Sequence, residues 1–336
     1  MIKALLKRVL FAIPTIFLVV VITFILARVV PGDPVTMVAG DTATEEQRAQ
    51  VREQLGLDDP LLVQFFRYCN DLLHGDLGYS WHSSNSVAED FKTRLPATLE
   101  LAIWSLLIAI LIGIPLGILS AIKKNSLLDH FCRIFSMVGS SMPIFWLGLM
   151  LIYYLFYKLR WFPAPLGRIA ITMTAPEKIT GLYVLDAMLA GDFKLAGKCA
   201  SYLVLPAVTL SMGTMSILAR MTRASMLETL NMEYVRTAKA KGISGAKVIC
   251  KHALSNALIP ILTVLGGQFG VLMGSTVVCE SIFSWPGIGT YLTQSILATD
   301  YNPVQAFTLL TAILYVLINL VLDVLYTVVD PRVRLE

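Results

Sequence analysis

Six apolar runs, each free of formal charge, constrain the fold of this chain more than any other feature of its sequence. Each run is long enough to cross the roughly 30 Å hydrocarbon core of a bilayer as a helix. Helices are the expected form, because a backbone surrounded by lipid must satisfy its hydrogen bonds within its own segment. The runs are Val9–Ala27, Leu101–Ile122, Ile134–Tyr157, Cys199–Ala219, Ala253–Cys279 and Tyr301–Leu322. The sequence therefore predicts an all-α integral membrane protein, a single domain over residues 1–336 with six transmembrane helices.

The composition agrees with this class. Of the 336 residues, 56% are hydrophobic and 15% are charged. A soluble domain of this length could not cover so much apolar surface. The first run follows Lys3, Lys7 and Arg8, as a signal peptide would. Its apolar core is too long, however, and no small-residue cleavage site follows, so we expect the run to be retained as a span.

The charges between the runs predict the orientation. With six spans, both termini share a side with the loops Lys123–Arg133 and Arg220–His252, and this side is rich in Lys and Arg. Positively charged loops stay in the cytoplasm, so we expect both termini to be cytoplasmic. The net charge of +4 is concentrated at these membrane boundaries. The expected partner of this charge is therefore the lipid bilayer and not a nucleic acid.

Catalytic, metal and ATP sites are not predicted in this chain. The four histidines lie outside the apolar runs, so no nucleophile–base pair is available within the membrane. The five cysteines lack the spacing of metal ligands. Residues 191–199 (GDFKLAGKC) approach a phosphate-binding loop, but the two glycines are one residue too far apart and Cys199 replaces the Ser or Thr. We therefore expect no cofactor in this chain.

The most basic stretch of the sequence is residues 233–260, between two apolar runs. Its pattern predicts two short helices, with Gly242 ending the first in a left-handed cap and Ser244 capping the second. Small side chains at Ala238 and Ala240 would let another protein approach closely. The second helix is expected to have one face formed by Ala246, Ile249 and Ala253. Such a unit, held rigidly beside a membrane, would suit the transmission of movement.

This stretch also carries a family resemblance. The run RTAKAKG at 236–242, followed by HALSNALIP at 252–260, resembles the cytoplasmic loop of permease subunits of bacterial dipeptide, oligopeptide and nickel ABC importers. Arg236 stands where other ABC-importer permeases have Glu, and Ser255 where many have Pro; both departures resemble the peptide/nickel branch. The same resemblance extends to GDLGYS (75–80), PATLEL (96–101), MPIFWLG (142–148) and ESIFSWPGIG (280–289). A basic loop that merely obeys the charge rule would explain the charge of the stretch but not its spacing.

The resemblance implies a fold, a location and a set of partners. The fold would be that of a type I ABC-importer permease with an extracytoplasmic helical insertion, in a bacterial inner membrane. The partners would be a second homologous permease (a heterodimer), two cytoplasmic ABC ATPase subunits or domains that hold ATP and Mg, and an extracytoplasmic substrate-binding protein. The chain itself would not be an enzyme. Contact with the ATPases would fall on Arg236, Thr237, Ala238, Gly242, Ser244, Gly245 and His252.

Glycines recur every fourth residue in the fifth run, at Gly266, Gly270 and Gly274. They make a flat strip on which another helix can lie close. Packing within the chain would explain this strip, and so would contact with the second permease or a place along the transport path. The outer end of the run carries Glu280, Trp285 and Pro286, which the resemblance would place near an outer gate. Glu280 would either line that gate or hydrogen-bond its own loop.

Two longer segments, 31–96 and 159–198, are expected on the outer side. In the first, Thr44 and Gln47 predict a capping box, and Pro60 starts a second helix with Leu61, Phe65, Cys69 and Leu72 on one face. The second segment lacks a clear pattern and is expected to be a loop with short elements. The first is acidic, and we expect Asp58, Asp59, Asp71 and Asp76 to help dock the binding protein. The alternative is a helical cap that only seals the ends of the spans.

The predicted function is therefore that of a permease subunit forming half of a path for dipeptides or oligopeptides. The same architecture could carry nickel chelates or glutathione instead. A self-sufficient channel or secondary transporter is the alternative from a different class. Such proteins usually show paired repeats or several charges within the membrane, and neither is evident in the sequence.

Overall fold

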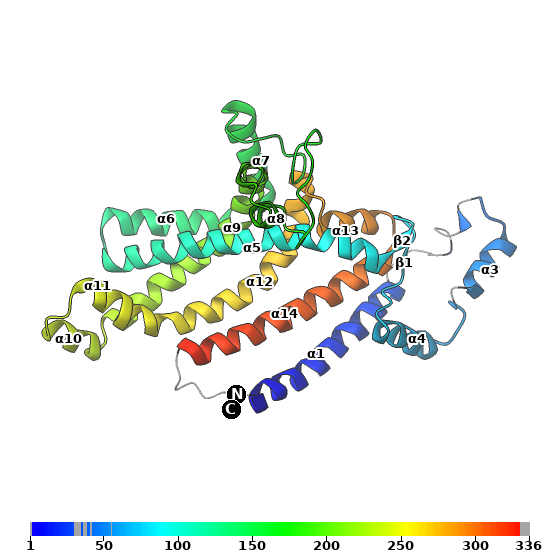
Figure 1. Cartoon of the computed structure of the whole chain (residues 1–336). Coiled ribbons are helices and arrows are strands. Elements are labelled where there is room, and N and C mark those ends of the chain that lie inside the picture. The colour runs from blue at the N-terminus through cyan, green and yellow to red at the C-terminus, as the bar shows by residue number, and fades with distance from the viewer. Residues whose placement is uncertain (1, 30–34, 36–38, 41, 55, 330–336) are drawn as a thin grey trace. The chain divides into compact units, whose positions relative to one another are not determined.

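Helices make up nearly all of the regular structure in the computed structural model, which describes residues 2–29, 35, 39–40, 42–54 and 56–329 (Figure 1). The helices are α1 (Ile2–Val29), α3 (Glu45–Gln54), α4 (Leu61–Leu73), α5 (Val87–Ile122), α6 (Leu127–Ser141), α7 (Ile144–Leu151), α8 (Tyr183–Leu189), α9 (Phe193–Leu230), α10 (Glu233–Ala240), α11 (Gly245–Lys247), α12 (Ser255–Phe283), α13 (Ile288–Leu297) and α14 (Tyr301–Val329). Two further segments, η1 (Ile152–Lys158) and η2 (Val248–Leu254), are π-helices. The strands β1 (Tyr79–Ser80) and β2 (Asn85–Ser86) pair antiparallel. Parts of the first long segment, 31–96, among them Asp41, lie outside the described residues.

Five helices in the described part of the chain are long and apolar enough to cross a membrane. They are Leu10–Arg28, Val87–Ile122, Phe193–Leu230, Gly245–Phe283 and Tyr301–Tyr326. These helices contain or overlap five of the six predicted runs, which confirms the all-helical membrane fold. With one broken pair counted as a further span, the number of spans rises to six.

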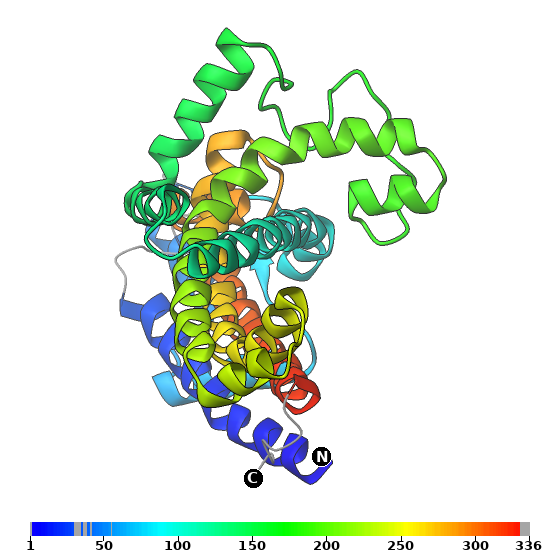
Figure 2. The ribbon, with the colours of Figure 1, turned by 90° about the vertical axis from the view of Figure 1, so that its left-hand side faces the viewer.

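The remaining run, Ile134–Tyr157, does not form the single helix that the sequence predicted. It is split between α6 and α7–η1, whose axes differ by 107° (Figures 1 and 2). The break is at Met142 and Pro143. The proline ring disfavours the helical conformation of the residue before it, and Met142 is extended, with φ −73° and ψ 127°. Apolar composition alone cannot distinguish this sharp bend from a kink within one span.

The chain divides into two compact units. Among the described residues, the core unit comprises those in 97–285 and 317–329, and the N-terminal unit those in 2–96 and 286–316. Helices α5 and α14 each contribute to both. In the N-terminal unit, α4 packs against α1 through edge-to-face contacts of Phe65 with Phe17 and Phe24. The predicted capping box forms, because Thr44 N donates to Gln47 Oε1 (2.9 Å) and Gln47 N donates to Thr44 Oγ1 (3.3 Å).

Helix α9 is the centre of the core unit. In its most apolar stretch 67% of the residues are buried, against 33% for the equivalent stretches of α5 and α12. Glycines let α5 approach it closely, since a Cβ on Gly117 would lie only 2.6 Å from the carbonyl oxygen of Ala219. A Cβ on Gly113 would likewise lie 2.8 Å from the Met215 oxygen. Helix α9 begins at Phe193, so the loop-like part of the second long segment is shorter than the predicted 159–198 and contains α8.

Two buried carboxylates, which the sequence analysis did not single out, join distant parts of the core unit. Glu100 on α5 accepts hydrogen bonds from Arg168 Nε (3.0 Å) and from Val184 N (2.8 Å). Arg168 also donates to the Gly181 oxygen (2.7 Å) and lies 3.5 Å from the centre of the Tyr183 ring. The irregular segment before α8 is thereby attached to α5.

The second carboxylate, Asp129 at the start of α6, is fully buried. Its two oxygens accept from Nε and Nη2 of Arg223 on α9, at 2.7 and 2.9 Å. The Ser120 hydroxyl of α5 donates to the same carboxylate at 2.6 Å. Three helices are therefore joined at one point.

Glu100→Gln tests the contribution of the first pair. The substitution leaves the Arg168 guanidinium, only 7% exposed, without its counter-charge. Breaking a buried pair in this way costs about 3–5 kcal/mol, so we expect a clear fall in the thermal unfolding temperature of the protein in detergent. The control on the same helix is Glu89→Gln, which removes an exposed contact with Lys92 at 3.9 Å and should change stability by less than about 1 kcal/mol. Equal shifts in the two variants would show that the Glu100 pair does not stabilise the core unit.

Candidate functional site

The basic stretch forms a hairpin of α10 and the α11–η2 arm, which we call the basic hairpin (residues 233–254). Its turn is a Schellman motif, in which Gly242 N donates to the Lys239 oxygen (3.0 Å) and Ile243 N to the Ala238 oxygen (3.3 Å). Gly242 has φ +74°. The predicted left-handed cap is therefore confirmed, and a side chain at this position would be strained.

The inner face of the hairpin is a small apolar core. Val235, Ala238 and Val248 are buried there, with Leu230 and Ile243 packed around them. This corrects the expectation for Ala238, which is 6% exposed and packs inside the hairpin, so it does not offer a surface to another protein. Arg236, Thr237, Ala240 and Gly245 are exposed. Arg236 makes a 2.8 Å ion pair with Glu233, and both side chains are largely in solvent.

The second arm differs from the short capped helix that the sequence predicted. Ser244 takes the N-cap position, but its side chain makes no capping hydrogen bond. After Lys247 the arm becomes the π-helix η2 and continues without a break into α12. The wider turn buries Val248 and Ala253 and leaves Ala246 exposed, contrary to the expected shared face. His252 lies half-buried on η2, and its carbonyl accepts from Asn256 Nδ2 at 2.8 Å.

The three glycines of α12 do not share one environment. Gly266 is buried, and a Cβ there would collide with Leu322 of α14 and lie 3.5 Å from Asn319 Oδ1. Gly270 is half-buried. Gly274 is exposed, and a Cβ there would meet open space. The strip therefore serves packing within the chain at Gly266, whereas the surface around Gly274 is not covered by this chain.

The end of α12 is tied to α5 within the core unit. Glu280 is fully buried and accepts from the Thr98 hydroxyl at 2.6 Å. Trp285 is also buried, and its Nε1 donates to the Ala97 oxygen at 2.8 Å. Ser284 between them turns the chain with φ +51°. Of the predicted gate residues, only Pro286 is exposed, and none of the three is thereby shown to line a path.

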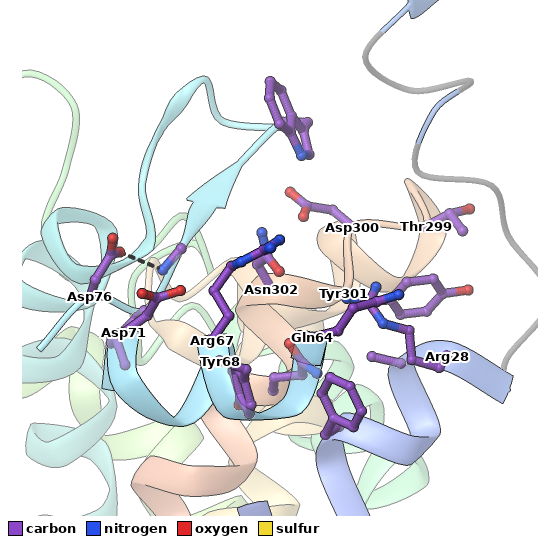
Figure 3. A pocket seen from close by; sticks show the side chains of 16 residues that line it. Arg28, Gln64, Arg67, Tyr68, Asp71, Asp76, Thr299, Asp300, Tyr301 and Asn302 are labelled. Atoms are coloured by element: carbon purple, nitrogen blue, oxygen red, sulfur yellow. Dashed lines mark hydrogen bonds between the residues drawn. The ribbon is translucent and has the colours of Figure 1, made fainter. Parts of the chain in front are cut away.

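A cavity of about 240 Å³ in the N-terminal unit brings together two of the four predicted docking acids. Asp71 and Asp76 line it, and Asp76 accepts from Gly78 N at 2.8 Å (Figure 3). Asp59 lies outside it, in a 2.6 Å ion pair with Arg67, which does line it. Asp58 is exposed and apart from this group. The four acids are therefore not one continuous patch.

Residues far away in the sequence complete this cavity. The same cavity is lined by Arg28 from the end of α1 and by residues at and just before the start of α14, namely Thr299, Asp300, Tyr301 and Asn302 (Figure 3). Asp300 accepts from the Ser80 hydroxyl at 2.7 Å and from His82 N at 3.2 Å, which fixes the β1 segment. No spacing along the chain could have indicated this arrangement, because its parts are more than 200 residues apart. Among the described residues, no group of three or more His, Cys, Asp or Glu side chains is placed to hold a metal ion.

Comparison with known proteins gives matches along nearly the whole chain. Residues 113–335 match the family "Binding-protein-dependent transport system inner membrane component", and residues 1–102 match the N-terminal family of the same membrane components. The probable D,D-dipeptide transport system permease protein of Escherichia coli K12 is 46% identical over 94% of this chain and 92% of its own. The dipeptide transport system permease protein of the same strain is 39% identical over 99% of both chains. The glutathione transport system permease protein of Salmonella paratyphi A is 37% identical, again over 99% of both.

These matches cover the apolar helices, the basic hairpin and most of the N-terminal unit. They place the protein in the inner membrane as a multi-pass subunit, and they imply a binding protein and an ATPase as partners. A permease subunit of this kind is not itself an enzyme. The chain belongs to the family of binding-protein-dependent transport system inner membrane components, as a permease subunit of an ABC importer.

Proposed function

We propose that this permease subunit forms one half of the translocation path for dipeptides, beside a second homologous permease. The observation that carries the proposal is the order of identities over nearly full-length matches. Relatives named for dipeptide or di/tripeptide transport are 39–46% identical to this chain, and those named for glutathione are 37% identical. The sequence identity to the glutathione relatives is only slightly lower than that to the dipeptide relatives. Glutathione is therefore the first alternative substrate to test, followed by nickel chelates.

The basic hairpin is the proposed contact with two cytoplasmic ATPase subunits or domains, which would hold ATP and Mg. Its exposed Arg236, Thr237 and Gly245 offer polar groups and space for a partner. The rigid turn and the unbroken passage of η2 into α12 would let a push on the hairpin reach the membrane helix. This arrangement requires the hairpin and both termini to be cytoplasmic, as the basic loops predict.

The orientation is tested by labelling in intact cells that lack the native cysteines. A membrane-impermeant thiol reagent should label a cysteine introduced at Ser84 and should not label one introduced at Gly245.

The acidic outer segment is the proposed docking surface for the binding protein. Asp58 is exposed, and Asp71 and Asp76 line a cavity that also contains Arg28 and Arg67. Such mixed charge suits a protein surface with polar contacts of both signs. The alternative is a helical cap that only seals the ends of the spans, and neutralising the four acids distinguishes the two.

The substrate is tested by uptake. The complete importer, with its ATPases and binding protein, is reconstituted into liposomes and supplied with radiolabelled alanyl-alanine. We expect unlabelled L- or D-dipeptides to compete with the label and glutathione or nickel–histidine not to compete. Competition by glutathione alone, with no dipeptide uptake, would contradict the proposal while leaving the family assignment intact.

The hairpin is tested at its turn. Gly242→Val puts a β-branched side chain at φ +74°, where left-handed backbone costs an L-residue about 1–2 kcal/mol. We expect the protein to insert normally while transport falls and ATP hydrolysis loses its dependence on substrate. Gly242→Asn is the matched control, because Asn tolerates this conformation, and it should retain most of the coupling. Normal coupling in Gly242→Val would show that the turn does not transmit movement.

The docking surface is tested by neutralising Asp58, Asp59, Asp71 and Asp76 together to Asn. Asn at position 76 can still accept from Gly78 N, so the local turn is kept. We expect stimulation of ATP hydrolysis by the binding protein to weaken and to lose its salt dependence, since exposed charges are screened over about 8–10 Å at physiological ionic strength. The control replaces the exposed Glu45, Glu46 and Glu53 with Gln, outside the cavity. Unchanged stimulation in the Asp variant would favour the cap.

A further inference from the structure

A second cavity, of about 320 Å³, lies in the core unit between α5, α6 and α9. It is separate from the basic hairpin and from the acidic outer segment. Three arginines line it: Arg133 from α6, and Arg220 and Arg223 from α9. Ser120 of α5 and Ser136 of α6 lie among them, and most of the remaining wall is apolar. A hollow with three guanidinium groups and an apolar wall is unusual enough to require an explanation.

The cavity exists because α6 is held to α9 at two separated places. At one, Asp129 pairs with Arg223. At the other, Gly139 lies so close to α9 that a Cβ there would collide with the Ser216 hydroxyl. One attachment is a pair of hydrogen bonds to a fully buried carboxylate, and the other is a close approach at a glycine. The hollow between them is therefore a fixed feature of the helix packing.

The charge inside the cavity is not balanced. Asp129 pairs with one of these arginines, Arg223, and its oxygens also accept from Ser120 and Asn125 N. Arg133 and Arg220 are exposed, and Arg133 contacts His130. In the described part of the chain, the lining of the cavity contains three guanidinium groups and no carboxylate, and Asp129 is paired with only one of the three, which leaves the cavity positively charged. Guanidinium groups match phosphate oxygens in geometry as well as in charge.

The depth of these arginines in the membrane follows from the sequence. Arg133 directly precedes the apolar run that begins at Ile134, and Arg220 directly follows the run that ends at Ala219. Because charged side chains at the ends of apolar stretches reach toward the headgroups, we take both arginines to lie at the boundary between hydrocarbon and headgroups. Beside them, the surface of α6 exposes Phe131, Ile134 and Met137, which are 65%, 63% and 70% exposed. Such an apolar surface can contact the acyl chains of a lipid whose phosphate is bound by the arginines.

We propose that this cavity is a binding site for an anionic phospholipid, with the phosphodiester headgroup between Arg133 and Arg220 and an acyl chain along α6. Basic pockets between transmembrane helices recognise such headgroups through the same combination of charge and apolar contact. The bound lipid would brace α6 against α9 and would make importer stability dependent on the anionic lipid content of the membrane. This inference does not depend on the identity of the transported substrate.

The test is native mass spectrometry of the complete importer, incubated with phosphatidylglycerol or phosphatidylethanolamine. We expect selective retention of phosphatidylglycerol by the wild type. Arg133→Gln with Arg220→Gln should lower retention about 30-fold, because each basic group near an anionic lipid contributes a factor of roughly five. Arg133→Lys with Arg220→Lys, which keeps the charge and loses the planar fork, should fall between these two.

The matched control is Lys123→Gln with Lys124→Gln, which removes two exposed charges from the adjacent loop without touching the cavity. It should retain the lipid as the wild type does. An equal loss in this control would mean that diffuse charge, and not the cavity, holds the lipid, and the proposal would fail. Displacement of the lipid by excess inorganic phosphate would instead indicate a site for free anions. Failure of the wild-type importer to retain phosphatidylglycerol would also overturn the proposal.

Discussion

Buried carboxylates hold the core unit together, because a charge withdrawn from water is stable only where donors are fixed around it. Glu100 joins α5 to the segment before α8, Asp129 joins α6 to α5 and α9, and Glu280 joins the end of α12 to α5. Each of these contacts requires its helices to approach at one particular register. Asp186 shows the same principle outside the membrane: burial alone would raise the pKa of its carboxyl, but hydrogen bonds from Thr180, Gly181 and Ile179 hold it below its usual value.

The glycines of α5 and α6 supply the complementary half of this packing. They let helix backbones approach where no side chain could fit. The carboxylates fix the crossing angle of the same helices and their position along the helix axis. Helix α9 receives both kinds of contact, which explains why it is so deeply buried. The basic hairpin is attached to this rigid assembly by covalent continuity with α12, so the part proposed to meet the ATPases and the part that packs in the membrane are one element.

Local patterns predicted local structure well. The apolar runs, the capping box at Thr44 and the left-handed turn at Gly242 each depend on residues close together in sequence. Two of the failures required knowledge of distant partners, since Glu100 and Arg168 are 68 residues apart and Ala238 is covered only because the second arm folds back on it. The bend at Pro143 has a local cause, but a proline in an apolar run produces either a small kink or a sharp break, and the pattern does not say which. The candidate site was therefore predictable as a segment and a turn, but not in its buried and exposed faces.

The π-helix in the second arm has a consequence for evolution within this family. A π-helical turn holds one more residue than an α-helical turn, and one residue corresponds to about 100° of rotation about the helix axis. The direction in which the hairpin leaves α12 is therefore set by a count of residues in Val248–Leu254. Conversion of the segment to an α-helix with the same number of residues would swing the hairpin about 100° around the membrane helix. Loss of one residue within the segment would convert it to an α-helix and leave the hairpin facing as before, whereas the same loss within α12 would rotate the hairpin about the helix axis.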